Sequence, residues 1–386
     1  MVFIIKKQET NKMKKKIFWV SILTFIHIIL PALVYALAPT LLWEKSLSEK
    51  IRDIEFAKDT GDVIVTTGDE IFLYNPAGEI VFHWGPRVDR EDTSVSITSD
   101  GSKFAYTDAY KEDYMIAKSI QDSDSRVRYL NRNGNELWNK NWEGFVRLSP
   151  DGSKVVINHS SEGEGFDILN ANGNILWSKG GDHWGDTTTE FSPEGNYVAV
   201  VGDAHSPMLL MKADTGDVLF TTTELNDYTA RTISDNATYL TTDPYTDVVS
   251  PDKSHDGKIY TKDGGILLNG WGVVSEDGSK VLMLYNDKTS LLRLPDPTPL
   301  QNFSIIGSPE AERAYADISR DGSYAVLIGQ KAGDTSSGLY VIDTVNNIVS
   351  NLNYSTVDVD VYITNDGKYV MVRNRNLKDI ALYQVF

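Results

Sequence analysis

The chain has 386 residues, of which 41% are hydrophobic and 24% charged, and its formal net charge is −17 at pH 7. A surface this acidic repels nucleic acid and anionic lipid headgroups, so we expect no nucleic acid among its partners. The absence of cysteine excludes disulfides, iron–sulfur clusters, Cys-based zinc sites and a bacterial lipoprotein anchor.

The first 38 residues differ from the rest. A basic segment from Lys12 to Lys16 precedes an apolar run, residues 17–38, that contains no Asp, Glu, Lys or Arg. This pattern is typical of an export signal. Cleavage is favoured after Ala36, because a cut after Ala38 would leave Pro39 as the next residue. The run is also long enough to span a bilayer, which takes about 20 residues, so an uncleaved anchor is the alternative.

Either reading predicts an extracytoplasmic protein, secreted or held at the cell surface. Residues 1–38 would then be a signal peptide or an N-terminal membrane anchor, and residues 39–386 a single folded unit. We expect that unit to be monomeric, and to meet a membrane only through the N-terminal segment if this is not cleaved.

The folded unit is built from a repeat that is clearest between Asn133 and Lys179, where the stretch begins and ends on nearly the same phrase. Between them lie short apolar runs separated by tight turns at Asp151-Gly152 and Asn172-Gly173. Short strands joined by such turns form an antiparallel meander. A repeated four-stranded meander is typical of a β-propeller.

The glycine of the first turn marks each repeat. It stands at Gly61, Gly101, Gly152, Gly195, Gly278, Gly322 and Gly367, with Asn236 in the equivalent place between Gly195 and Gly278. The average spacing is about 44 residues, within the roughly 40 to 50 expected of a blade. Asn tolerates a positive φ better than other non-glycine residues, which supports its assignment to this turn. The sequence therefore predicts an all-β fold, a single eight-bladed propeller. Seven blades with a separate eighth motif is the alternative.

The ring has a predicted closure. The last repeat, from Val359, has room for three strands, while residues 41–47 carry an outer-strand phrase ahead of the first blade. Its Leu-Trp-x-Lys pattern matches those at Trp138 and Trp177. We therefore expect this N-terminal strand to complete the last blade and leave no open edge; an unpaired leader strand is the alternative.

Function is predicted on one face of the ring. The connections between first and second and between third and fourth strands are tight, whereas the others are long, as at 108–126, 243–256 and 329–338. Binding residues concentrate in loops held by a rigid scaffold. The candidate ligand contacts on this long-loop face are Tyr110, Tyr114, His183, Trp184, His205 and Tyr245; the alternative is that these loops are tolerated insertions.

A second set of candidates lies on the inner strands. Each stands two residues before the serine that opens the first turn, Ser149 in the repeat described above, or close to that position. These channel residues are Glu55, Arg147, Glu190, Asp317 and Tyr362, with Ser96 as a further equivalent. Their mixed charges could hold a ligand or an ion. The interpretation we favour is that they pair with one another in a water-filled channel.

One acidic loop has part of a calcium-binding pattern. Asp252, Ser254 and Asp256 have the oxygen-ligand spacing of an EF-hand loop, but Asp263, at the twelfth position, should lie across a strand on the opposite face. The loop could therefore form a looser calcium site or be a solvated acidic loop, and we favour the solvated loop. No His-Glu-x-x-His, Gly-x-Ser-x-Gly or phosphate-binding glycine motif is present, so we predict no catalytic residues.

The turns SPDGSK (149–154), SEDGSK (275–280), SRDGSY (319–324) and TSDGSK (98–103) resemble the WD40-like repeats of TolB-type exported propellers. The phrases NGNELWNK (133–140) and NGNILWSK (172–179) resemble the quinoprotein-type repeats of pyrroloquinoline-quinone dehydrogenases and of BamB-type scaffolds. Those enzymes commonly carry adjacent cysteines beside the quinone, and this chain has none, so no quinone cofactor is expected.

The one-sided distribution of long loops and the absence of a catalytic motif favour a non-catalytic exported scaffold that binds an envelope protein or glycan through the long-loop face. The alternative is a lyase- or hydrolase-type propeller enzyme, with a metal-assisted site over the channel mouth formed by acids such as Glu190 or Asp317.

Overall fold

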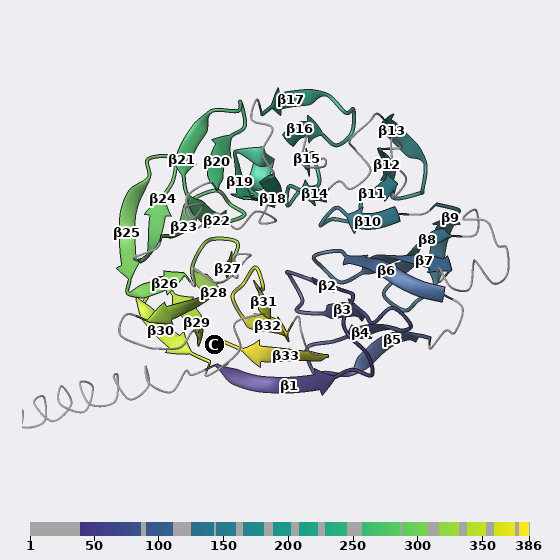
Figure 1. Ribbon diagram of the computed structural model, residues 1–386, viewed down its shortest axis with the longest axis horizontal. Helices are drawn as coiled ribbons and strands as arrows, with labels where there is room; N and C mark the ends of the chain where they lie inside the picture. Colours follow the sequence, from purple (N-terminus) through teal and green to yellow (C-terminus); the bar gives the residue numbers. More distant parts are fainter. Residues whose placement is uncertain are drawn as a thin grey trace, which may run out of the picture.

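The computed structural model describes residues 39–85, 90–110, 125–142, 144–159, 165–180, 188–201, 208–222, 228–244, 257–285, 288–307, 316–331, 338–352, 359–374 and 378–385. These residues form eight antiparallel sheets arranged as a ring (Figure 1). The prediction of an all-β, eight-bladed propeller is confirmed. Within the described ranges, no helix has the length and apolar character needed to cross a membrane.

Blades 1 to 4 follow the chain as simple meanders. Blade 1 contains β2 (Asp53–Phe56), β3 (Val63–Thr66), β4 (Ile71–Tyr74) and β5 (Ile80–Trp84); blade 2 contains β6 (Arg90–Ile97), β7 (Lys103–Tyr110), β8 (Arg126–Asn131) and β9 (Glu136–Lys140). Blade 3 contains β10 (Gly144–Leu148), β11 (Lys154–His159), β12 (Phe166–Asn170) and β13 (Ile175–Lys179); blade 4 contains β14 (Thr188–Phe191), β15 (Tyr197–Val201), β16 (Met208–Lys212) and β17 (Val218–Thr221).

Blades 5 to 8 complete the ring. Blade 5 contains β18 (Tyr228–Ile233), a 3-10 turn η2 (Asp235–Ala237), β19 (Tyr239–Pro244), β20 (Lys258–Thr261) and β21 (Ile266–Asn269); blade 6 contains β22 (Trp271–Val274), β23 (Lys280–Leu284), β24 (Thr289–Arg293) and β25 (Thr298–Phe303). Blade 7 contains β26 (Ile305–Gly307), β27 (Ala316–Ile318), β28 (Tyr324–Lys331), β29 (Gly338–Asp343) and β30 (Ile348–Asn351). Blade 8 contains β31 (Val359–Ile363), β32 (Tyr369–Asn374), β33 (Asp379–Gln384) and β1 (Thr40–Ser46).

The two ends of the described chain close the ring in blade 8. Strand β1 pairs antiparallel with β33, from Thr40 opposite Gln384 to Ser46 opposite Asp379, and Figure 1 shows the two strands side by side. This confirms the predicted closure by the N-terminal strand. Because β33 is hydrogen-bonded on both sides, the last blade presents no open edge at its third strand.

An aromatic side chain on the outer strand locks each of five blades to the next. The Trp43 indole donates a hydrogen bond to the Pro76 carbonyl (3.1 Å), and the same bond joins Trp138 to Ala171 (3.0 Å) and Trp177 to Ala213 (2.9 Å). Each ring packs on the glycine of the following blade's third turn, as do the rings of Phe82 and Phe220. At Gly78, where φ is +78°, a Cβ would lie 2.8 Å from the Trp43 ring. Glycine is therefore needed there both for the backbone conformation and for space.

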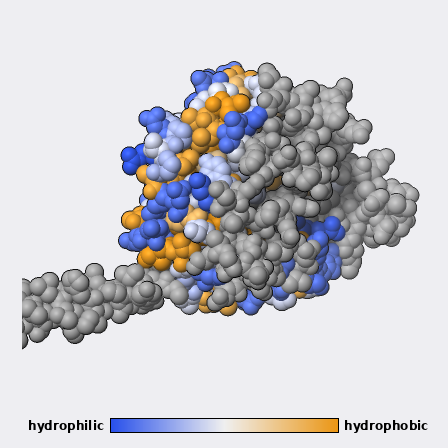
Figure 2. Space-filling view, turned by 60° about the vertical axis from the view of Figure 1, so that its left-hand side comes forward, coloured by the Kyte–Doolittle hydropathy of each residue, from blue (hydrophilic) through white to orange (hydrophobic). Residues whose placement is uncertain are grey.

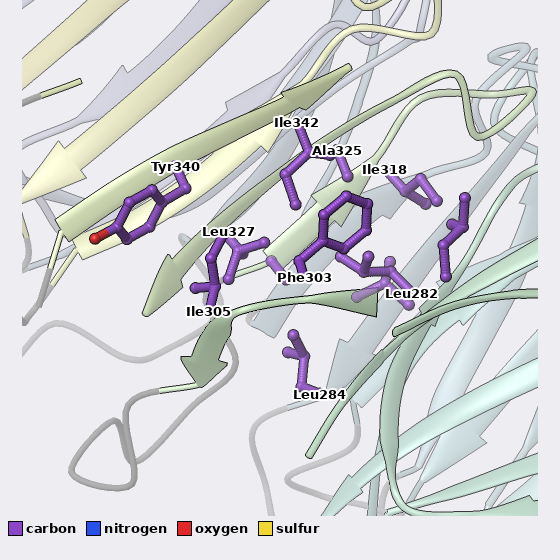
Figure 3. Close-up of a cluster of buried hydrophobic side chains, with 12 residues drawn as sticks. Leu282, Leu284, Phe303, Ile305, Ile318, Ala325, Leu327, Tyr340 and Ile342 are labelled. Carbon is purple, nitrogen blue, oxygen red and sulfur yellow. The ribbon is translucent and has the colours of Figure 1, made fainter. Parts of the chain in front are cut away.

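The core lies between neighbouring blades. Figure 3 shows the cluster between blades 6 and 7, where Leu282 and Phe303 meet Ile318 and Leu327. Middle strands such as β3 and β16 are buried at nearly every residue because a sheet covers each of their faces, which explains their almost continuous apolar sequence.

The outer strands are different, because their far side faces solvent. Figure 2 shows hydrophobic and hydrophilic residues alternating over this wall. Exposed aliphatic side chains gather where the outer strands begin; we call this set the aliphatic rim, and it consists of Leu41, Leu42, Ile80, Leu137, Ile175, Leu176, Val218, Ile266, Leu300 and Val349. Every blade contributes at least one of them.

The first turns form a belt of backbone hydrogen bonds between blades. Asn365 donates to Lys58 (2.7 Å), Asp59 to Ser99 (2.8 Å), and Ser99 to Pro150 (2.8 Å). Pro150 and Pro193 stand at the next two donor positions, and a proline has no N–H to continue the chain of bonds. At Asn236 φ is +57°, as expected from its place among the glycines, and Ala237 also has a positive φ, of +51°.

Blade 7 departs from the predicted four strands. Its inner edge is split into β26 and β27, which pair with opposite ends of the long strand β28. The eight residues between the two strands carry no turn signal that distinguishes an insertion inside a strand from a connection between strands.

Candidate functional site

The two faces of the ring differ in their connections. The first and third turns share one face, here called the tight-turn face. There β10 ends at Leu148 and β11 begins at Lys154, and the same five-residue first turn recurs in every blade except blade 1, whose turn is one residue longer. The carboxylate of Asp151 accepts hydrogen bonds from the Ser149 hydroxyl (2.6 Å) and the Ser153 amide (3.0 Å), and blades 2, 6, 7 and 8 repeat this pattern.

The opposite, long-loop face has connections of very unequal length. In blade 1, β3 ends at Thr66 and β4 begins at Ile71, whereas in blade 2 β7 ends at Tyr110 and β8 begins at Arg126. In blade 5, β19 ends at Pro244 and β20 begins at Lys258. Between the described strands, first turns differ in length by one residue at most, and so do third turns, whereas the connections on the long-loop face differ by ten or more between blades 1 and 2, which is the arrangement of a rigid scaffold that carries variable loops.

A cavity of about 260 Å³ occupies the centre of the ring. All eight inner edges contribute to its wall, and first-turn residues such as Lys58, Pro193 and Glu276 place it at the tight-turn end of the channel. The residues that the sequence assigned to the channel, Glu55, Arg147, Glu190, Asp317 and Tyr362, all line it, as does Ser96.

Arg147 is the central cation of this wall. From blade 3 its guanidinium contacts the Glu55 carboxylate of blade 1, and it lies 3.3 Å from the Glu190 carboxylate of blade 4. Blade 2 lies between blades 1 and 3, so the contact with Glu55 skips a blade. The arginine therefore ties three blades together across the channel.

A second ion pair skips a blade in the same way. The Lys58 ammonium of blade 1 contacts the Asp317 carboxylate of blade 7. Asp317 also accepts backbone hydrogen bonds from Ile318 and from Ile363 of blade 8, both at 2.9 Å. This carboxylate thus links blades 7, 8 and 1, next to the point where the ring closes.

The inner strands would be open edges if nothing covered their amides. Polar side chains of one blade accept hydrogen bonds from the next: Asp53 from Val95 (2.9 Å), Ser96 from Leu148 (3.0 Å) and Thr232 from Val274 (3.3 Å). Such bonds satisfy backbone groups that a central channel would otherwise leave unpaired. Much of the polar character of the channel therefore has a structural use.

Burial raises the pKa of three acidic groups on the inner strands and first turns. It raises the pKa of Glu276 to about 7; Asp317 and Asp59 act in the same direction, while Lys58 and Arg320 oppose them. The nearest Arg320 nitrogen lies 3.9 Å from the Glu276 carboxylate, too far for a strong hydrogen bond. Burial also raises the pKa of Tyr362 and of Asp53. Glu276 is therefore a channel group whose pKa lies near neutral.

Sequence reasoning missed Lys58, Glu276 and Thr232 in this wall. Lys58 and Glu276 lie in the first turns, and Thr232 was hidden because blade 5 lacks the usual Asp-Gly signal. Counting one position per inner strand would have found Thr232, whereas Lys58 and Glu276 required the ring geometry.

The loop-face candidates lie outside the described residues, except for Tyr110, whose backbone ends β7. The calcium candidates Asp252, Ser254 and Asp256 also lie outside them. Asp263 lies in the third turn of blade 5, on the tight-turn face, where its carboxylate accepts a hydrogen bond from the Thr261 hydroxyl. Among the side chains that the structure describes, no three or more His, Asp or Glu come together as a metal site.

Comparison by sequence finds no matching family model and no matching curated protein. Comparison by structure gives the C-terminal WD40 domain of Sif2, with a TM-score of 0.61 and 11% identity, over 90% of this chain and 99% of that domain. It also gives the β-propeller domain of Cps50 (Swd1) from Myceliophteria thermophila, with a TM-score of 0.49 and 9% identity, over 90% of this chain and all of that domain. At such identities the likeness to Sif2 shows the fold, a WD40-type β-propeller.

Proposed function

We propose that the protein is a non-catalytic, extracytoplasmic scaffold that binds an envelope protein or glycan through its long-loop face. The observation that carries this proposal is the inequality of the two faces. Every first turn has five or six residues, while the connections after β7 and β19 are extended. A folding requirement would act on both faces alike, so the one-sided variation is better explained by recognition.

Export rests on the sequence of the first 38 residues, as does the choice of an envelope partner. The TolB- and BamB-type repeat phrases support the same location. With 53 acidic and 31 basic residues left after cleavage at Ala36, the net charge of −22 favours a neutral or basic partner.

A loop graft tests the assignment of the face. In blade 2 the residues between Tyr110 and Ser125 are replaced by Thr67–Glu70, which make the same connection in blade 1. The matched control carries Asn133→Arg and Asn172→Arg, which place bulky charges on exposed positions of the tight-turn face. We expect pull-downs from envelope extract to lose the partner with the graft and to retain it with the control. Equal recovery by the graft and the wild type, or loss with the control, would contradict the chosen face.

An enzyme with its site over the channel mouth is the competing proposal, and the cavity is the observation that favours it. Its candidate acids are already engaged: Glu190 lies beside Arg147, and Asp317 contacts Lys58 and accepts two backbone hydrogen bonds. Screening the protein on envelope polysaccharides with and without EDTA separates the two proposals. Turnover that is lost with EDTA and with Glu190→Gln would favour the enzyme.

A further inference from the structure

The position of β1 fixes where the N-terminal segment leaves the propeller. Thr40 pairs with Gln384 at the end of β33, and β33 runs from the long-loop face to the tight-turn face. The chain before Thr40 therefore leaves from the tight-turn face, at the outer edge of blade 8. Only Pro39 separates Thr40 from the apolar run 17–38.

If the apolar run stays in a membrane, this one-residue connection holds the propeller close to the bilayer. One residue spans at most about 3.6 Å, so the beginning of β1 would lie at the bilayer surface. The first side chains there are Leu41 and Leu42, which are 47% and 39% exposed. Exposed apolar side chains can form contact sites, and of the aliphatic rim these two lie nearest to the apolar run in the sequence.

The aliphatic rim continues on both neighbouring blades. Ile80 of blade 1 is 55% exposed, and Val345 in the third turn of blade 7 is 67% exposed, with Val349 beside it. In Figure 1, β5 and β30 flank β1 along the same edge of the ring. The aliphatic rim runs round the whole ring, and at blade 8 it lies next to the place where the apolar segment joins the fold.

The rest of the tight-turn face is poorly suited to lie flat on lipid. Aspartates of the first turns, Asp100, Asp151 and Asp321 among them, line this face. Burial acts to raise the pKa of each, but hydrogen bonds from neighbouring hydroxyl and amide groups lower it overall, so all three are ionised at neutral pH. Moving several carboxylates into a lipid interface is costly.

We propose that the protein, held by residues 17–38, rests on the lipid bilayer with the apolar edge of blade 8, tilted so that its long-loop face points away from the membrane. The inference rests on the extracytoplasmic location in the proposed function, and it takes the alternative in which the N-terminal segment is not cleaved. Leu41 and Leu42 are the residues expected in the headgroup region, where partly buried aliphatic side chains contribute to membrane binding.

The absence of native cysteine allows a direct test with single-cysteine labels. Leu42→Cys and Ile80→Cys report on the proposed edge. Val218→Cys is the matched control, because it occupies the same rim position on blade 4, four blades away, and is 48% exposed. Each full-length variant is labelled with an environment-sensitive fluorophore and reconstituted in phosphatidylcholine vesicles that contain a spin-labelled lipid.

We expect a blue shift and loss of emission at position 42, a weaker loss at position 80 and neither at position 218. Equal quenching at 42 and 218 would show that the face lies flat, and no quenching at 42 would show that the edge does not touch lipid; either result overturns the proposal. Because the assay contains no partner, its failure leaves the loop-face pull-down unaffected, so the two proposals fail separately.

Discussion

Removing the Trp43 side chain tests how the ring is held shut. Trp43 is 8% exposed, packs among Leu47, Ile51 and Tyr74, and binds the Pro76 carbonyl of blade 1. Truncation of a buried tryptophan to alanine costs about 3 to 5 kcal/mol. For a folded unit of this size that corresponds to a lower Tm by about 4 to 7 °C. Trp43→Ala should therefore be clearly destabilised in thermal and urea melts.

Trp138→Ala is the matched control, because Trp138 makes the same hydrogen bond and glycine contact between blades 2 and 3. It should cost a similar amount, since both indoles fill the same kind of pocket. Deletion of residues 37–47 should cost more than either substitution and cause aggregation, because it exposes the edge of β33. The reasoning is refuted if Trp43→Ala, or the deletion, melts within a degree or two of the wild type while Trp138→Ala is destabilised.

Three further predictions concern the charges of the channel and turns. Because burial raises the pKa of Glu276 to about 7, above its unfolded value near 4.3, the wild type should lose stability relative to Glu276→Gln as pH rises from about 4.5 to 7; a stability difference between the two that is constant with pH would refute this. Arg147→Met should cost about 1 to 2 kcal/mol in urea melts, since the guanidinium is partly exposed, and adding Glu190→Gln should recover part of it; an unchanged midpoint would contradict the pairing. Hydrogen bonds lower the pKa of Asp151 despite its partial burial, so Asp151→Ala should be less stable than the wild type at pH 7, and the difference should shrink as pH falls below about 4; a deficit that persists in acid would mean that the loss is not electrostatic.

The repeat could be predicted from the sequence because the residues that mark it are close together in the chain. The tight turns need residues that accept a positive φ, and this requirement identified Asn236 as well as the glycines as turn residues. The ring closure was also readable, because Trp43 carries the phrase of an outer strand in a place where no blade precedes it. These features follow from short-range chemistry that one sequence displays.

The channel was only partly predictable. Counting back from the motif serine led to Glu55, Arg147, Glu190, Asp317 and Tyr362, all of which line the cavity. The partners were not predictable, because the contacts of Arg147 with Glu55 and of Lys58 with Asp317 skip a blade. Such pairs depend on the curvature of the closed ring, which no local pattern encodes. The split inner edge of blade 7 was not predictable because residues 308–315 carry no turn signal that distinguishes an insertion inside a strand from a connection between strands.

The most direct test of the proposed scaffold function is a photo-crosslinking map made on intact cells. A photoreactive residue is placed at 116 or 250, in the long connections of blades 2 and 5, or at 133 or 172, in the tight turns. If the long-loop face binds an envelope protein or glycan, the first two positions should give the same crosslinked species and the last two should give none. Crosslinks from 133 and 172 alone would assign binding to the tight-turn face and contradict the proposal.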